Sequence, residues 1–249
     1  HEGGGQVSCY GSLAGYYDKL TGDVPYSKFI EFYEAEFARD GGEFRLLLDL
    51  CCGTGTLTCE LARRGYEMIA ADASVDMLMQ AREKTAELPC PPLFLCQDAA
   101  ELDLYGTVDA AVCSLDGMNY IAPDALPEVF HRLHLFVRPD GLLIFDIRTP
   151  EWLRALDGDI FVDEKDDVLC LWRADFDEEM PAIVYGMDIF SRVGRLWERG
   201  SEEHIEYAHE PQALKQLLEA AGFTDVQLRR DCPQGDAGRM FIVATRNEE

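Results

Sequence analysis

Two glycines and three acids have the types and spacing of a ligand-binding loop. Gly53 and Gly55 follow a run of apolar residues that begins at Leu46 and precede a helical pattern over residues 57–64. Glycine permits a sharp turn and lets a ligand approach the backbone without a Cβ in the way. The N–H groups at the start of the following helix favour an anionic or carboxylate-bearing group. A plain strand–turn–helix connection is the simpler alternative.

The three acids extend this pattern beyond one loop. Asp49 lies in the first apolar segment, before the glycines. Asp72 ends the second apolar segment, and Asp98 follows the third. In doubly wound folds, an acid at the carboxyl end of the second strand hydrogen-bonds a ribose diol. The ordered set therefore indicates a nucleotide-containing cofactor.

The glycine spacing leaves two classes of nucleotide cofactor open. A dinucleotide-binding fingerprint needs a third small residue, which allows the helix to pack closely on the strand. Thr58 stands at that position. This weakens the interpretation as a nicotinamide-dependent oxidoreductase but leaves it as an alternative.

The elements expected to position these residues form an α/β fold. Apolar segments alternate with helical patterns, which predicts a mostly parallel sheet with helices on its faces. Residues 138–141 (Arg-Pro-Asp-Gly) are predicted to be a turn. Pro211 begins a further helix that Gly222 closes, and two final strands complete seven. The predicted strands after the first are 67–72, 93–96, 108–113, 142–147, 225–228 and 239–245, and the predicted helices before the last are 25–39, 57–64 and one within 124–137.

The alternation of strands and helices stops at Arg148. The next sixty or so residues contain apolar runs separated by acidic turns, which predicts an inserted antiparallel β cap. Near the start of the chain, Tyr16-Tyr17-Asp18 is predicted to be a loop that could close over a pocket. We therefore expect an N-terminal helical or lid segment at 1–40, an α/β domain at 41–147 and 209–249, and the cap at 148–208.

Composition limits the possible partners. The 249 residues carry a net charge of −25, which repels nucleic acids and anionic membranes. No apolar run approaches the roughly 18 residues of a membrane span. The nine cysteines form no CxxC pair and no zinc-ligand spacing, which favours reduced thiols and a cytoplasmic protein without a metal.

The ordered acids and glycines resemble the first motifs of class I S-adenosylmethionine-dependent methyltransferases. The likeness covers roughly residues 16–245, with Cys51 where the first glycine of the motif often falls. The segments 16–20, 23–26, 98–99 and 115–121 resemble a group of bacterial small-molecule methyltransferases related to sugar N,N-dimethyltransferases and glycine N-methyltransferases. The resemblance implies a Rossmann-like seven-stranded sheet with an antiparallel cap after strand five.

The resemblance also implies a place for each part of S-adenosyl-L-methionine. The Gly53–Gly55 loop and Asp49 would hold the methionine portion, and Asp72 the ribose hydroxyls. Asp98 would accept a hydrogen bond from the adenine amine. The residues expected to contact the cofactor are Tyr16, Asp49, Cys51, Gly53, Gly55, Asp72, Ala73, Met77, Asp98, Ala99, Ser114 and Leu115.

Methyl transfer from a sulfonium requires alignment of the acceptor, and a base only where the acceptor must lose a proton. The candidates for that base are Tyr17, His204 and Asp116, and Tyr120, Arg148 and Trp172 could line the acceptor. The acidic charge favours an amine. We expect a small-molecule acceptor and a monomer or homodimer; a non-catalytic ligand-binding module of the same fold is the second alternative.

Overall fold

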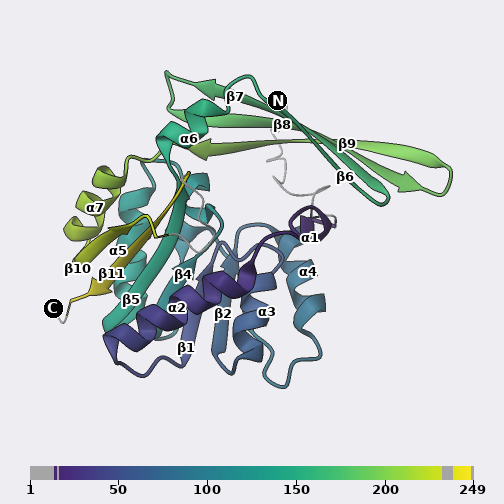
Figure 1. The fold of residues 1–249 in the computed structure, drawn as a ribbon. Helices are drawn as coiled ribbons and strands as arrows, with labels where there is room; N and C mark the ends of the chain where they lie inside the picture. Colours follow the sequence, from purple (N-terminus) through teal and green to yellow (C-terminus); the bar gives the residue numbers. More distant parts are fainter. Residues whose placement is uncertain (1–13, 16, 232–237, 248–249) are drawn as a thin grey trace, which may run out of the picture.

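The computed structural model describes residues 14–15, 17–231 and 238–247. The described residues form a seven-stranded sheet in the order β10-β11-β5-β4-β1-β2-β3, with a separate four-stranded sheet beside it (Figure 1). The strands of the large sheet are β1 (Leu46–Leu50), β2 (Glu67–Asp72), β3 (Leu93–Cys96), β4 (Val108–Cys113), β5 (Val137–Arg148), β10 (Phe223–Arg229) and β11 (Arg239–Arg246).

The large sheet is the predicted, mostly parallel one. The pairs among β1 to β5 are parallel, whereas β11 runs antiparallel to both β5 and β10. One local prediction was wrong, because residues 138–141, predicted to be a turn, belong to β5. The chain kinks there without leaving the sheet: Asp140 adopts a left-handed conformation with φ 58°, and the pairing register with β4 shifts.

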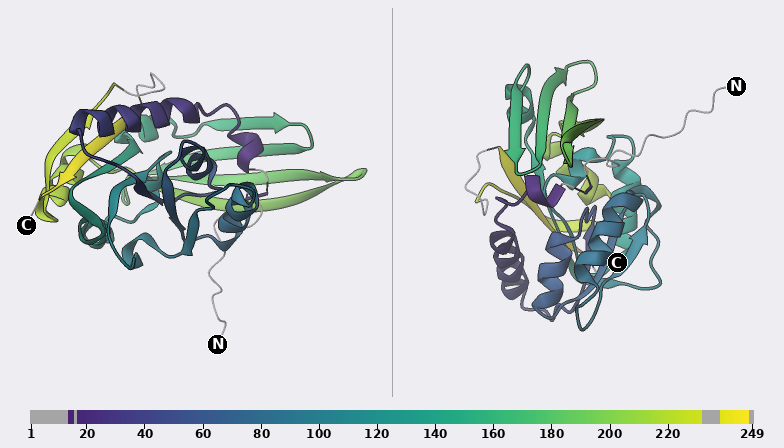
Figure 2. Two further views of the ribbon diagram at one scale, coloured as in Figure 1. Left: turned by 90° about the horizontal axis from the view of Figure 1, so that it is seen from below. Right: turned by 90° about the vertical axis from the view of Figure 1, so that its right-hand side faces the viewer.

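Helices cover both faces of this sheet (Figure 2). The helices α2 and α3 pack with one set of alternating strand residues, and α5 and α7 pack with the other set. This follows from the two-residue period of a strand, which sends neighbouring side chains to opposite faces. The helices are α1 (Tyr17–Leu20), α2 (Tyr26–Asp40), α3 (Thr56–Arg63), α4 (Val75–Thr85), α5 (Leu126–Phe136), α6 (Pro150–Ala155) and α7 (Pro211–Ala220), with short 3₁₀ turns η1 (Ala99–Glu101) and η2 (Gly117–Tyr120).

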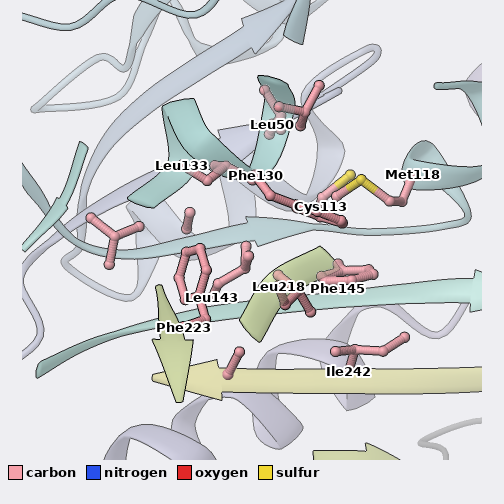
Figure 3. Packing of buried hydrophobic residues seen from close by; sticks show 14 of the residues in the cluster. Leu50, Cys113, Met118, Phe130, Leu133, Leu143, Phe145, Leu218, Phe223 and Ile242 are labelled. Carbon is pink, nitrogen blue, oxygen red and sulfur yellow. The ribbon is translucent and has the colours of Figure 1, made fainter. Parts of the chain in front are cut away.

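The core on the α5–α7 face anchors the central strands. Phe130 of α5 and Leu218 of α7 lie with Leu143 and Phe145 of β5 in one buried cluster (Figure 3). The Phe130 and Phe145 rings stack with centroids 6.0 Å apart. Such packing holds the strand ends, and therefore the loops that follow them, in fixed positions.

The second sheet lies across the carboxyl-end side of the large sheet (Figure 1). It is antiparallel, in the order β6-β7-β8-β9, and has its own buried cluster. Its strands are β6 (Ile160–Lys165), β7 (Val168–Asp177), β8 (Ala182–Val193) and β9 (Leu196–Tyr207). We call this sheet the cap. The helices described contain no segment long and apolar enough to span a membrane.

Candidate cofactor and acceptor site

The loop after β1 is built from three left-handed residues. Cys51, Gly53 and Gly55 have φ values of 55°, 54° and 68°. A Cβ on Gly53 would meet open space, whereas one on Gly55 would lie 2.8 Å from the Cβ of Ala81 in α4. The two glycines therefore have different roles. Gly53 leaves its backbone accessible, and Gly55 lets α3 and α4 pack closely. Cys51 adopts the backbone conformation that favours glycine at the position where the resemblance expects one.

Asp49 lies beneath this loop. It is 2% exposed, and its Oδ2 accepts a hydrogen bond of 2.5 Å from the Thr58 hydroxyl. Thr58 stands where a dinucleotide fingerprint has a small residue. Its hydroxyl instead donates a hydrogen bond to the buried Asp49 carboxyl group. Burial raises the pKa of the Asp49 carboxyl to about 7 despite the Thr58 hydrogen bonds.

Asp72 is oriented by two backbone groups at the end of β2. The N–H of Gly53 donates to its Oδ2 and the N–H of Ser74 to its Oδ1, both at 2.8 Å. Burial raises the pKa of this carboxyl. Each oxygen keeps acceptor capacity for a further donor. Beside it, Ala73 is exposed and Met77 is buried in the first turns of α4.

Asp98 and Ala99 follow β3 at the same edge of the sheet. The register pairs Asp72 with Cys96, which places Asp98 just beyond the end of β3. Its Oδ1 caps η1 by accepting from the Ala100 N–H at 2.8 Å. Asp98 is exposed and Ala99 half-buried, so an acceptor and a backbone donor stand beside Asp72.

The turn after β4 is strained and firmly held. Leu115 and Asp116 have φ values of 54° and 61°, a region that non-glycine residues rarely occupy. Their N–H groups donate to the two carboxylate oxygens of Asp146 in β5, at 2.9 and 3.1 Å. The Ser114 hydroxyl lies 2.5 Å from the Tyr33 hydroxyl of α2. Asp146 is a positioning residue that the sequence interpretation did not single out.

A buried arginine joins this turn to β11. Arg239 is 3% exposed, and its Nη1 is hydrogen-bonded to the carboxylates of both Asp116 and Asp146. The Nε of Arg148 lies 3.9 Å from Asp116, and its guanidinium stacks over the Trp152 ring at 4.0 Å. Asp116 therefore lies between the guanidiniums of Arg148 and Arg239.

Asn119 connects the large sheet to the cap. Its side chain accepts from the Arg148 N–H at 2.9 Å and donates to the carbonyls of Arg148 and Tyr207, at 3.2 and 2.9 Å. It is completely buried. One amide therefore fixes η2, the end of β5 and the end of β9 relative to one another.

The N-terminal segment contacts both parts. Tyr17-Asp18, predicted to lie in a loop, begins the short helix α1, and Tyr16 lies outside the described residues. Asp18 accepts from the Thr54 hydroxyl at 2.6 Å and pairs with Lys84 at 2.6 Å. A pocket of about 280 Å³ borders these groups and is lined by Asp18, Thr21, Gly22, Tyr26, Thr56, Cys59, Glu60, Arg63 and Lys84.

Tyr17 brings its phenol to the acids under the cap. Burial, reinforced by Tyr26, Asp116 and Glu206, raises the pKa of Tyr17. The side chain also packs against the buried cluster of the cap. Tyr17 therefore stays un-ionised near neutral pH and can act through its hydroxyl as a hydrogen-bonding group.

The inner face of the cap contributes the remaining candidates. His204 is 1% exposed, packs edge-on against Tyr120 with ring centroids 6.1 Å apart, and lies 3.2 Å from the Glu202 carboxylate. Trp172 packs edge-on against Tyr185 at 6.2 Å. His204 of β9 thus packs on Tyr120 of η2, and Trp172 of β7 packs on Tyr185 of β8.

Glu206 is the site residue that the sequence interpretation missed. It is 6% exposed, and its carboxyl group interacts electrostatically with Asp116, Arg148 and Arg239. The sequence does contain a signal: Glu202, His204 and Glu206 alternate along β9, as residues on one face of a strand do. This alternation identifies Glu206 as a site residue only once this face of β9 is known to be buried.

Comparisons with known proteins agree with this geometry. The model of a methyltransferase domain family matches residues 47–141. A putative methyltransferase of Bacillus subtilis, YqeM, is 27% identical over 246 residues, covering 96% of this chain and 98% of the relative. The crystal structure of an S-adenosylmethionine-dependent methyltransferase from Clostridium acetobutylicum superposes with a TM-score of 0.83 at 28% identity, covering 96% of this chain and 99% of the other.

The fold is also shared with the sugar N-methyltransferase KedS8 of Streptoalloteichus, at a TM-score of 0.81, 20% identity and full coverage of both chains. The sheet order, the loop after β1 and these matches define a Rossmann-like methyltransferase fold. Together these findings support a class I S-adenosylmethionine-dependent methyltransferase. The oxidoreductase and non-catalytic alternatives are thereby set aside.

Proposed function

We propose that this enzyme transfers the methyl group of S-adenosylmethionine to an amine nitrogen of a small molecule. The observation that supports an amine is the charge of the acceptor side of the site. Three buried or half-buried carboxyl groups, those of Asp116, Asp146 and Glu206, face the two guanidiniums of Arg148 and Arg239. Among the described residues of this cluster, carboxyl groups outnumber guanidiniums, so one carboxyl group remains to pair with a cationic acceptor, which would favour its ionised form.

The residues present fit the cofactor. Gly53 leaves space for the methionine end, and Asp72 offers two oriented oxygens for a diol. Asp98 and Ala99 offer an exposed acceptor and a backbone donor for the adenine edge. In this proposal, Asp49 and Cys51 support the methionine portion, Ala73 and Met77 flank the ribose, and Ser114 and Leu115 line the sulfonium.

When bound, the cofactor supplies a methyl group already activated by its sulfonium charge. The enzyme's residues must orient the acceptor and exclude water. The cap and α1 lie at the carboxyl ends of the strands, where open α/β sheets bind ligands (Figure 1). We assign Tyr17, Tyr120 and Trp172 to lining the acceptor, Arg148 and Asp116 to its polar contacts, and His204 to positioning Tyr120.

The proposal is tested with purified enzyme and a panel of small amines, carboxylic acids and phenols. S-adenosylmethionine is expected to raise the melting temperature, and NAD is not. Methyl transfer, followed as formation of S-adenosylhomocysteine, is expected with members of the amine set. Turnover confined to acids or phenols would contradict the amine assignment while leaving the enzyme class intact.

A further inference from the structure

Glu206 differs from the other acids of the site because one of its oxygens is buried without a hydrogen bond to any described residue. Its Oε2 is buried and forms no hydrogen bond within the described part of the chain, whereas the Tyr120 hydroxyl hydrogen-bonds its carboxyl group. A buried acceptor without a donor is costly, and such groups are typical of sites that meet a ligand. The inference below rests on the amine acceptor proposed above.

The neighbours of Glu206 place its carboxyl group on the acceptor side of the site. Asp116, which interacts with it, follows Ser114 and Leu115 at the end of β4. The phenols of Tyr17 and Tyr185 also interact with it, from α1 and β8. Glu206 therefore faces the end of β4 from the cap, across the region where methyl transfer is proposed.

We propose that Glu206 is the catalytic base that takes the proton from the ammonium form of the acceptor. The other acids are less suited to this role. Asp146 already accepts two backbone N–H groups and Arg239, and Asp116 is paired with Arg239. Tyr17 holds its own proton because its pKa is raised.

The proton transfer is balanced within the site. One N–H bond of the ammonium breaks, and its proton bonds to a carboxylate oxygen of Glu206. The nitrogen lone pair then forms a bond to the methyl carbon as the methyl–sulfur bond breaks and its electron pair stays on sulfur. The positive charge thus moves from sulfur to the methylated nitrogen, and Glu206 later returns the proton to solvent.

The electrostatic surroundings support this role. Burial and the Asp116 charge raise the pKa of Glu206 to about 8, while Arg148, Arg239 and the Tyr120 hydrogen bond oppose the rise. A base with a pKa near the working pH is well matched to general base catalysis. A cation that binds beside the carboxyl group favours its ionised form, so binding of an ammonium drives a proton from the pair.

Sinefungin tests this without knowledge of the acceptor. Sinefungin is an S-adenosylmethionine analogue in which a carbon atom that carries a primary amine replaces the methyl-bearing sulfur. S-adenosylhomocysteine lacks that amine. Binding of both is measured by calorimetry near pH 7 in buffers of different ionisation enthalpy, which also counts the protons released. The variants are Glu206→Gln and, as the matched control, Glu203→Gln, an exposed residue of the same strand.

Glu206→Gln is expected to weaken sinefungin by roughly tenfold or more, the size of a lost charge-assisted hydrogen bond, and to leave S-adenosylhomocysteine unchanged. The unaltered enzyme and Glu203→Gln are expected to release close to one proton more with sinefungin than with S-adenosylhomocysteine, whereas Glu206→Gln should release the same number with both ligands. Equal sinefungin affinity and proton release in all three proteins would overturn the base assignment. Failure of the unaltered enzyme to bind S-adenosylhomocysteine would instead overturn the proposed cofactor site.

Discussion

At the scale of single residues, the site depends on carboxyl groups whose surroundings differ. Asp72 is held by two backbone N–H groups, Asp49 by one threonine hydroxyl, and Asp116 by arginines. Glu206 keeps one oxygen without a donor among the described residues. We propose that these environments suit Asp72 to ligand binding, Asp49 to loop support, Asp116 to charge pairing and Glu206 to proton acceptance.

Asp72→Asn tests the ribose contact. The substitution keeps the shape of the side chain but removes the charge that strengthens its hydrogen bonds. We expect the affinity for S-adenosylmethionine to fall by roughly 1.5–3 kcal/mol in a calorimetric titration. Asp175→Asn, at an exposed position of β7, serves as the control and should bind as the unaltered enzyme does. Full affinity of Asp72→Asn would remove Asp72 from the cofactor site.

Asp49 makes the stability of the ligand-free enzyme depend on pH. Its pKa is about 7 in the folded chain and 3.8 in its usual environment, so the folded state binds its proton more tightly. The contribution of Asp49 to the free energy of unfolding is therefore fully present below about pH 4. It is lost as the pH rises from about 4 to 7, by at most about 4 kcal/mol.

Asp49→Asn removes this ionisation. Denaturant unfolding at several pH values should therefore show the unaltered enzyme losing stability relative to Asp49→Asn between pH 5 and 7. The contribution of Glu206 is common to both proteins and cancels in the difference. Parallel stability curves over this pH range would contradict the raised pKa of Asp49.

At the scale of elements, side chains at a few junctions hold the parts of the site together. α1 is attached to the glycine loop through Asp18, Thr54 and Lys84, and Lys165 of β6 pairs with Asp23 at 3.1 Å. Asn119 connects η2 with β5 and β9. Polar contacts therefore attach the N-terminal segment to the glycine loop and to the cap, and attach the cap to the large sheet.

Asp18→Ala should loosen α1. The lost hydrogen bonds and the partly exposed ion pair are worth about 1 kcal/mol, or a factor of roughly five in local opening. Hydrogen exchange over residues 17–21 should accelerate by that order, as read by mass spectrometry. Glu31→Ala, which also removes an acid but at an exposed position of the neighbouring helix α2, is the matched control. Unchanged exchange in Asp18→Ala would show that α1 is held by other contacts.

Asn119→Ala should destabilise the whole chain. It leaves buried backbone groups of Arg148 and Tyr207 without their donor or acceptor, at a cost of roughly 2–4 kcal/mol in the free energy of unfolding. Chemical denaturation measures this loss. Gln212→Ala, on the exposed face of α7, should change stability little. An equally small effect at Asn119 would mean that the cap is fixed independently of this amide.

At the scale of the whole molecule, the large sheet was predictable because local patterns define it. Residues 67–72, 93–96 and 108–113 form strands with the predicted bounds, since each is a short apolar segment between turn signals. Residues 138–141 were misassigned because Pro139 and Gly141 indicate a turn, whereas the segment is an irregular part of β5 between the paired residues Val137 and Leu142.

The acceptor side of the site could be predicted only in part. Arg239 meets Asp116 and Asp146 across about a hundred residues of sequence, and Glu206 faces them only because the cap folds back over the strand ends. No local sequence pattern predicts these long-range contacts. The cofactor side, by contrast, uses the first residues after consecutive parallel strands, which topology brings to one edge.

Methyl transfer to an amine nitrogen is the central claim, and tracing a labelled methyl group tests it most directly. The enzyme is incubated with S-adenosylmethionine carrying a ¹³C-labelled methyl group and a mixture of small cationic, neutral and anionic metabolites. Mass spectrometry and nuclear magnetic resonance then locate the label. We predict a product whose labelled methyl group is bonded to nitrogen. A label found on oxygen or carbon would contradict the claim.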